Sequence, residues 1–398
     1  MTPNCKVLVL AGPFVLLLAC GSEAVTPTSA ATDAAAGEPP ANAADATILQ
    51  DDAAGELTTD SGTQVDTGAA GAPGVDSGTA MDAEDVTDSG RQVDSGSPTG
   101  IPWTLIVLPD TQYYSSTYPQ IFDAQANWII NQATALNIRY VAHEGDIVDN
   151  DVDGQWTNAS HSMHLLDLKV PYALAIGNHD YPGGGGAVSR DTTLFDSYFS
   201  LTSLDWQPSF QAPYQPGSAA NSYHLFEANG QSWLIISLEF GPRDAVLTWA
   251  DGVLKANSSA NAIVLTHAYL YLDGTRFDHK TRTDQAFSPH GYGIDALPGG
   301  VNDGEEIWQK LILGNSNIRF VFCGHVVDRG VGRLSSVRPD GTTVHQVLAN
   351  YQMLQRGGDG FLRVMQFFPT LGTVHVQTYS PYLNSLKTDP DNDFFLAY

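Results

Sequence analysis

The chain has 398 residues, 42% of them hydrophobic, and a formal net charge of −26 at pH 7. This composition can supply a large core, and the acidic balance without a basic stripe excludes long nucleic acid as a preferred partner. Of the cysteines Cys5, Cys20 and Cys323, only the last lies beyond residue 20, so a chain processed there has no intramolecular disulfide.

Residues 1–20 have the pattern of an export signal. Lys6 precedes an apolar stretch, residues 7–18, that is too short to span a membrane. The stretch ends in Leu17-Leu18-Ala19-Cys20, which resembles a bacterial lipoprotein box, in which the cysteine is acylated. We therefore expect a lipoprotein-type signal peptide and a membrane anchor through a lipid on Cys20 at the cell envelope. Ordinary cleavage near Ala19 is the alternative and would give a secreted protein.

Residues 21–100 are predicted to be a disordered acidic tether rich in Ala, Asp, Gly, Ser and Thr. This segment has no aromatic residue, and Arg91 is its only base among 15 acidic residues. Such a composition cannot bury enough apolar surface to fold, and self-repulsion extends it. Short Val-Asp-x-Gly units recur, but they lack the dense periodicity of calcium-binding β-helices.

Residues 101–180 show a repeating strand and helix pattern. Apolar runs at 105–108, 140–142 and 173–176 predict buried strands. An apolar stripe after Pro119 predicts a helix over 121–132, and a second helical pattern at 161–168 precedes Pro171. The order β-α-β-α-β favours a mainly parallel sheet that is covered by helices.

The remaining chain is rich in predicted strands. Residues 263–265 and 318–322 are apolar runs, and 222–227 with 233–238 should form a hairpin across Asn229-Gly230. Residues 344–348, 360–368 and 373–379 are further predicted strands. We expect residues 101–398 to form an α/β domain in which two mixed β-sheets pack as a sandwich with flanking helices.

Polar, metal-binding side chains follow five of these apolar runs. Because ligands at the ends of parallel strands converge on one rim of a sheet, these segments predict a metal site. A carboxylate can bridge two cations, and glycines before the ligands suit tight turns close to the ions. The segments are Asp110-Thr111-Gln112, Gly145 to Asn150, Gly177-Asn178-His179-Asp180, Thr266-His267 and Cys323-Gly324-His325.

Together the motifs resemble those of the calcineurin-like metallophosphoesterase family, namely Asp-x-His, Gly-Asp-x-x-Asp, Gly-Asn-His-Asp or Glu, a later strand-end His, and Gly-His-x-His. The resemblance covers residues 101–380. It implies a four-layer fold, two divalent metal ions (Mn, Fe, Zn, Mg or Ca) and hydrolysis of a small phosphate ester by metal-activated water. It further implies that Asp110 holds the first ion, that Asp146 bridges both, that Asn178, His267 and His325 hold the second, and that His179 is a general acid.

Two departures from the family pattern weaken the first metal site. Gln112 stands where the family has His, and Val327 replaces the second His of Gly-His-x-His. Gln112 can still offer a carbonyl oxygen, which favours Mn, Mg or Ca at the first site. Asp328 is a candidate to replace the missing ligand, and the alternative for it is a surface ion pair with Arg329. A non-catalytic surface binding protein that keeps the fold is therefore the alternative function.

Several neighbours have predicted supporting roles. Asp180 is expected to orient the His179 imidazole, while Asp149 and Asn150 brace the bridging loop. Asp149 also stands where purple acid phosphatases carry a metal-binding Tyr, which argues against that subgroup. His143 is expected to be a hydrogen-bonded strand-end histidine, and Cys323 a buried thiol without a chemical role.

Substrate contacts are harder to infer, because they belong to loops. Residues 183–186 are four consecutive glycines that form either a mobile lid or an exposed insertion. Four bases follow His267 and are expected to help bind a phosphate ester. They are Arg276, His279, Lys280 and Arg282.

Overall fold

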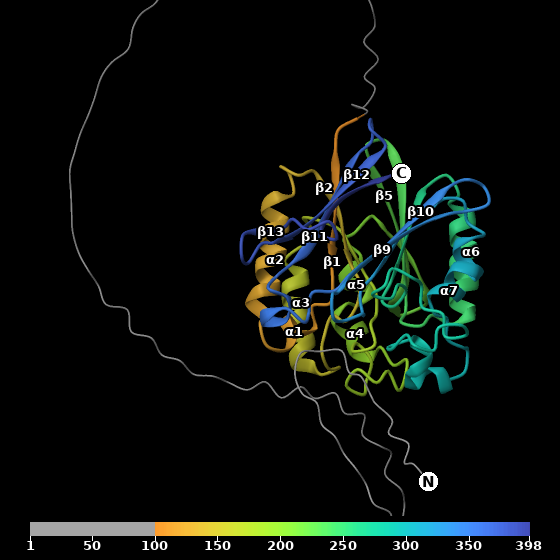
Figure 1. Cartoon of the computed structure of the whole chain (residues 1–398). Coiled ribbons are helices and arrows are strands. Elements are labelled where there is room, and N and C mark those ends of the chain that lie inside the picture. The colour runs from red at the N-terminus through yellow and green to blue at the C-terminus, as the bar shows by residue number, and fades with distance from the viewer. Residues whose placement is uncertain (1–99) are drawn as a thin grey trace, which may run out of the picture. The chain divides into compact units, whose positions relative to one another are not determined.

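Two seven-stranded mixed sheets pack against each other, and helices lie on their outer sides (Figure 1). The computed structural model describes residues 100–398. The predicted export signal, the lipid-bearing Cys20 and the acidic tether lie outside the described residues. Within the described residues, no helix has the length and apolarity needed to cross a membrane.

The first sheet has the order β13-β12-β11-β1-β2-β3, and β14 pairs with β12. Strands β1, β2 and β3, with β3 at the edge of the sheet, are parallel, whereas β11 runs antiparallel to β1. The strands are β1 (Trp103–Leu108), β2 (Ile138–His143), β3 (Tyr172–Leu174), β11 (Leu362–Phe368), β12 (Thr373–Ser380), β13 (Ser385–Lys387) and β14 (Asp393–Ala397).

The second sheet has the order β4-β5-β6-β7-β8-β10-β9. Four neighbouring strands, β6, β7, β8 and β10, are parallel, and the outer strands are antiparallel. The strands are β4 (Phe210–Gln215), β5 (Ser218–Ala228), β6 (Gln231–Leu238), β7 (Asn261–Thr266), β8 (Ile318–Cys323), β9 (Val331–Val337) and β10 (Thr343–Ala349).

Helices α2 and α3 cover the first sheet, while α6 and α7 lie on the far side of the second (Figure 1). Pro119 occupies the first turn of α2, where its missing N–H leaves no hydrogen bond unmade. The helices are α1 (Gln112–Ser116), α2 (Pro119–Gln132), α3 (Asp153–His164), α4 (Thr193–Tyr198), α5 (Leu201–Leu204), α6 (Asp244–Ala256), α7 (Gly304–Ile307) and α8 (Gln355–Gly358), with short turns η1 (Pro289–Gly291), η2 (Gly293–Ala296) and η3 (Trp308–Ile312).

The core alternates along the strands. Leu105 and Val107 point between the sheets, whereas Ile106 and Leu108 point to the helical side, as a two-residue repeat requires. Trp233 of the second sheet contacts Trp103 and Phe367 of the first, with ring centroids 5.0 and 5.1 Å apart. Both faces of strands such as β1, β7 and β8 are thus buried, which explains their nearly continuous apolar runs.

The predicted fold class is confirmed, with differences in element boundaries. The hairpin at Asn229-Gly230 is present, with φ of 52° and 71° at the two turn residues. The second predicted helix, 161–168, lies earlier in the chain than expected, because α3 spans Asp153–His164. The third strand ends at Leu174, earlier than predicted, since the following residues turn toward the rim. Strands β4, β9, β13 and β14 and the 13-residue helix α6 were not predicted.

Candidate metal centre

The predicted ligands lie where the parallel strands of both sheets end. In the first sheet, Asp110, Asp146 and Asn178 follow β1, β2 and β3. In the second sheet, His267 and His325 follow β7 and β8. All five are buried, with at most 6% of each side chain exposed. The strand-end rule therefore brings these residues to one rim, as predicted from the sequence.

The Asp146 loop is shaped by glycine. Asp146 has φ of 48° and the preceding Gly145 has φ of 96°, so the chain turns sharply at the end of β2. A Cβ at Gly177 would lie 2.1 Å from Asp146 Oδ1, which no side chain can approach. Only glycine at this position lets the Asn178 loop approach the carboxylate. The same oxygen accepts the backbone N–H of His179 over 3.0 Å.

Asp146, His267 and His325 form the centre of the cluster. Each offers a ligand atom, and these atoms lie within 4.8 Å of one another. His267 Nδ1 lies 2.9 Å from the Glu144 carbonyl oxygen and donates to it, so Nε2, which lies 3.1 Å from Asp146 Oδ2, is the ring nitrogen left for an ion. His325 Nε2 lies 2.8 Å from the Phe287 carbonyl oxygen, which leaves Nδ1 for an ion. Such backbone contacts orient ligating imidazoles.

Asp110 completes the buried acidic pair with Asp146. Its carboxylate accepts the backbone N–H of His325 and the side-chain N–H of Asn350, the latter over 2.9 Å. Burial raises the pKa of Asp110 to about 7. The nearby His267 lowers this pKa, and the charge of Asp146 raises it. Burial also disfavours the charged form of Asp146, but the imidazoles of His267 and His179 hold its pKa below the usual range. Two carboxyl groups this close favour a cation between them.

Two buried acceptors in this cluster have no hydrogen-bond partner in the described part of the chain. They are Gln112 Oε1 and Asn178 Oδ1. The other polar atom of each side chain is satisfied: Gln112 Nε2 donates to Asp149 Oδ1 over 3.1 Å, and Asn178 Nδ2 donates to the Gly185 carbonyl over 2.8 Å. Unpaired buried acceptors are costly, and two amide oxygens at one rim match the oxygen ligands that divalent ions accept. The donor set therefore fits bound metal.

The structure corrects the role predicted for Asp180. Its two oxygens accept the backbone N–H groups of Val148 and Gly177, over 3.0 and 2.8 Å, and do not contact His179. Asp180 thus joins the loops that carry Asp146 and Asn178. The His179 imidazole is oriented instead by the Asp149 backbone, because Nδ1 lies 2.7 Å from that carbonyl oxygen.

Asp149 and Asn150 brace the bridging loop as predicted. Their backbone N–H groups both donate to Gln155 Oε1, over 2.8 and 2.9 Å. The Asn150 side chain donates to Asp149 Oδ2 over 2.8 Å. Asp149 therefore connects the Gln112 side chain to the loop that presents His179.

The glycine segment 183–186 lies against His179. Gly185 has φ of 83°, and a Cβ there would lie 2.5 Å from Cε1 of His179. Its carbonyl accepts the Asn178 side chain. This part of the segment is neither a free insertion nor remote from the site, because it forms a wall beside His179.

Position 327 contributes no ligand. Val327 is half-buried, and the neighbouring Asp328 is exposed with φ of 74°. Both interpretations of Asp328 are wrong: it is not among the grouped ligand atoms, and Arg329 pairs with Asp391 over 3.0 Å. Asn350, which contacts Asp110, was not predicted from the sequence. Its place directly after β10 is the same strand-end signal that identified the other residues.

The four bases after His267 do not form a phosphate site. Each pairs with acids of its own region, so the predicted contact to substrate is wrong. The pairs are Arg276 with Glu305, His279 with Asp303, Lys280 with Glu306, and Arg282 with Asp273 and Asp284.

Two predictions of non-catalytic roles are confirmed. His143 is fully buried, with Nε2 2.9 Å from the Thr111 hydroxyl and Nδ1 3.2 Å from the Gly145 backbone nitrogen. Burial lowers its pKa to about 3, with the neighbouring His267 acting in the same direction. Cys323 is also fully buried, and burial raises the pKa of its thiol, which makes it inert.

Comparison with known proteins gives one related sequence and several related folds. Protein YvnB of Bacillus subtilis (strain 168), itself uncharacterized, is 33% identical over 300 residues, which are 74% of this chain and 21% of that protein. The chain thus spans about a fifth of the length of this relative.

The related structures are remote. Purple acid phosphatase PPD1 from yellow lupin has a TM-score of 0.43 and 15% identity, over 75% of this chain and 54% of that one. The NAD nucleotidase of Haemophilus influenzae has a TM-score of 0.37 and 13% identity, over 73% and 50%. GAP50 of Plasmodium has a TM-score of 0.39 and 14% identity, over 74% and 89%.

The family model for calcineurin-like phosphoesterases matches residues 104–329. This range begins in β1 and ends after the loop that carries His325, so it includes every predicted ligand and His179. On this evidence the chain belongs to the calcineurin-like phosphoesterase family.

Proposed function

We propose that this protein hydrolyses small phosphate esters with the help of two divalent ions and uses His179 as a general acid. One observation carries the proposal: two unpaired buried amide oxygens and two buried carboxylates meet at the rim where His179 lies. A purely structural cluster would have paired these atoms, because each unpaired acceptor costs stability.

The residues divide between two ions. Asn178, His267 and His325 would hold the second ion through one amide oxygen and two ring nitrogens, while Asp110 and Gln112 would hold the first. Asp146 would be shared, since its carboxylate lies 3.1 Å from His267 Nε2 and its charge also raises the pKa of Asp110. Bound divalent ions would acidify a water molecule and neutralise charge that builds up on the phosphoryl oxygens.

His179 is placed to give a proton to the leaving group. The Asp149 carbonyl engages Nδ1, so Nε2 is the ring nitrogen left for a substrate. The side chain is 26% exposed, which allows contact with a ligand at the rim. Because Nδ1 and the backbone N–H are both held, the ring keeps its position during a reaction.

The test combines metal content with activity. The full chain would be loaded with Mn²⁺ or Zn²⁺, analysed for bound metal and screened against alkyl and aryl phosphate monoesters and diesters. Asp146→Asn should lose most bound metal and all measurable turnover, whereas Asp284→Asn, an exposed change beside Arg282, should behave like wild type. Near-normal turnover of Asp146→Asn with metal supplied would overturn the assignment.

Val327 supports one alternative, a surface protein that binds a ligand without hydrolysing it. Without an imidazole at this position, the first ion lacks a nitrogen ligand that the family provides. The same experiment separates the two functions. Bound metal together with no turnover on any ester of the screen would favour the binding protein.

We further propose that Cys20 carries a lipid, from the Leu17-Leu18-Ala19-Cys20 sequence. Wild type would then partition into the detergent phase, while Cys20→Ser would be soluble or unprocessed because no thioether can form. Cys5→Ser is the matched control and should keep the wild-type behaviour. A processed wild-type protein in the aqueous phase would contradict the anchor.

A further inference from the structure

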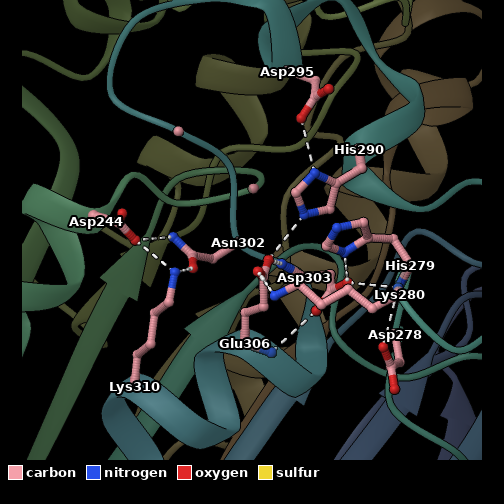
Figure 2. Close-up of polar contacts among 12 residues, drawn as sticks. Asp244, Asp278, His279, Lys280, His290, Asp295, Asn302, Asp303, Glu306 and Lys310 are labelled. Atoms are coloured by element: carbon pink, nitrogen blue, oxygen red, sulfur yellow. Dashed lines mark hydrogen bonds and ion pairs between the residues drawn. The ribbon is translucent and has the colours of Figure 1, made fainter.

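A second group of metal-binding side chains lies away from the candidate metal centre. It is formed by the long segment between β7 and β8, which contains η1, η2 and α7. His279, His290, Asp303 and Glu306 each offer a ligand atom, and these atoms lie within 4.8 Å of one another (Figure 2). None of the four is among the predicted ligands of the phosphoesterase site.

The distances in this cluster match those around a single ion. His279 Nδ1 lies 2.8 Å from Asp303 Oδ2, and His290 Nε2 lies 2.9 Å from Glu306 Oε2. Metal bonds of about 2.0–2.2 Å at right or tetrahedral angles place neighbouring ligand atoms about 2.8–3.6 Å apart. Small side-chain movements would therefore admit an ion without rearranging the backbone.

His290 provides an independent sign of metal binding. Its Nε2 faces the cluster, while Nδ1 lies 2.8 Å from Asp295 Oδ1 on the opposite side of the ring (Figure 2). A carboxylate behind a ligating imidazole is the usual arrangement in metal sites, because it fixes the tautomer and makes the ligating nitrogen more basic. A simple ion pair would need only one of the two carboxylates.

The charges of the region also favour a cation. Asp295, Asp303 and Glu306 surround the two rings, and within residues 100–398 Lys280 is the only other base in contact, 2.7 Å from Glu306 Oε1. The rings of His279 and His290 are stacked, with centroids 3.5 Å apart. Two imidazolium ions would repel each other in that position. If both rings are neutral and bind one metal ion, the positive charge lies on the ion, next to the carboxylates.

We infer that His279, His290, Asp303 and Glu306 form a structural site for one zinc-class divalent ion, separate from the phosphoesterase centre. Two imidazoles and two carboxylates suit Zn²⁺ or another first-row divalent ion better than Mg²⁺ or Ca²⁺. Asp303 is 1% exposed and the other side chains are 13–30% exposed, so the site is sheltered yet reachable.

The site would fasten the segment that borders the candidate metal centre. His279 precedes and His290 follows Phe287, whose carbonyl contacts His325 Nε2. The Tyr292 hydroxyl lies 3.4 Å from the same nitrogen. An ion that joins both histidines to the start of α7 would hold these two contacts in place.

The test measures zinc in the full chain after equilibration with Zn²⁺ and removal of free metal. The double variant His279→Gln/His290→Gln should bind one zinc fewer per chain than wild type, and the same difference should appear in the Asp146→Asn background. His375→Gln is the matched control, because it breaks a His–Asp pair at 2.6 Å elsewhere and should leave zinc content unchanged.

A second variant keeps the test decisive if the double variant does not fold. Asp295 is 47% exposed, so Asp295→Asn should leave the fold intact and remove only the carboxylate behind His290. We expect zinc affinity at this site to fall about 10- to 100-fold, measured by competition with a chromogenic chelator. Equal zinc content in the double variant and wild type would overturn the inference. An unchanged affinity in Asp295→Asn would do so as well.

Discussion

Replacing Asp180 with asparagine tests how the two ligand loops are joined. In the structure the Asp180 carboxylate accepts one N–H from the Asp146 loop and one from the Asn178 loop, over 3.0 and 2.8 Å. The side chain is fully buried. Asparagine has nearly the same shape but only one acceptor, so its NH₂ group would face a backbone N–H.

The expected cost follows from those two contacts. A hydrogen bond to a charged group contributes about 1.5–3 kcal/mol, and an unpaired buried donor adds a penalty of about 1–3 kcal/mol. Because the wild-type carboxylate is itself costly to desolvate, part of this loss is offset. We therefore expect the free energy of unfolding to fall by about 2–4 kcal/mol. For a domain of this size that corresponds to a thermal midpoint lower by roughly 5–10 °C.

Kinetics with two esters would show which role Asp180 has. Since Asp180 does not contact His179, Asp180→Asn should lower turnover by a similar factor on an alkyl ester and on a nitrophenyl ester. His179→Ala should instead lose about 10²- to 10⁴-fold on the alkyl ester and far less on the nitrophenyl ester, whose leaving group needs little protonation. If Asp180→Asn shows the same dependence on the leaving group, the assignment of Asp180 to the loops is refuted.

Three further changes test other contacts. Gly185→Ala should displace the His179 imidazole, because the new Cβ would lie 2.5 Å from Cε1, and should lower turnover at least about tenfold with metal content retained; unchanged steady-state kinetics would contradict the wall described here. Trp233→Ala should lower the free energy of unfolding by about 3–5 kcal/mol, because its fully buried ring fills the space between the sheets; a loss below about 1 kcal/mol in denaturant unfolding would show that this core repacks. Removal of divalent ions with a chelator should lower the thermal midpoint, by the equivalent of about 4 kcal/mol when the metal had been present at a thousand times its dissociation constant, and adding Mn²⁺ should restore it; a midpoint insensitive to chelation and metal would mean that the described site holds no ion.

Local signals in the sequence predict the fold class and the position of the metal centre. Apolar runs of strand length that are followed by a polar residue identify β1, β2, β3, β7 and β8 and the ligands that follow them, and in three of the five a glycine precedes the ligand. This works because chain direction and burial are encoded in neighbouring residues, and parallel strands end at the same rim. Edge strands such as β9, which alternate exposed and half-buried residues, carry a weaker signal.

Contacts between distant segments could not be predicted, because they depend on how loops from different strands meet. Asn350 reaches Asp110 across 240 residues of sequence, and no local pattern connects the two. Asp180 and His179 are neighbours in the sequence, yet their side chains contact different partners. The contact between the His179 imidazole and the Asp149 carbonyl forms only when the two loops meet in the folded chain. In the same way, Lys280 was predicted to bind phosphate, but in the folded chain its ammonium group lies 2.7 Å from Glu306 of α7. The sequence by itself thus determines which residues stand at the rim, whereas tertiary structure decides what each one contacts, because a strand end sets a position and the surrounding loops supply the partner.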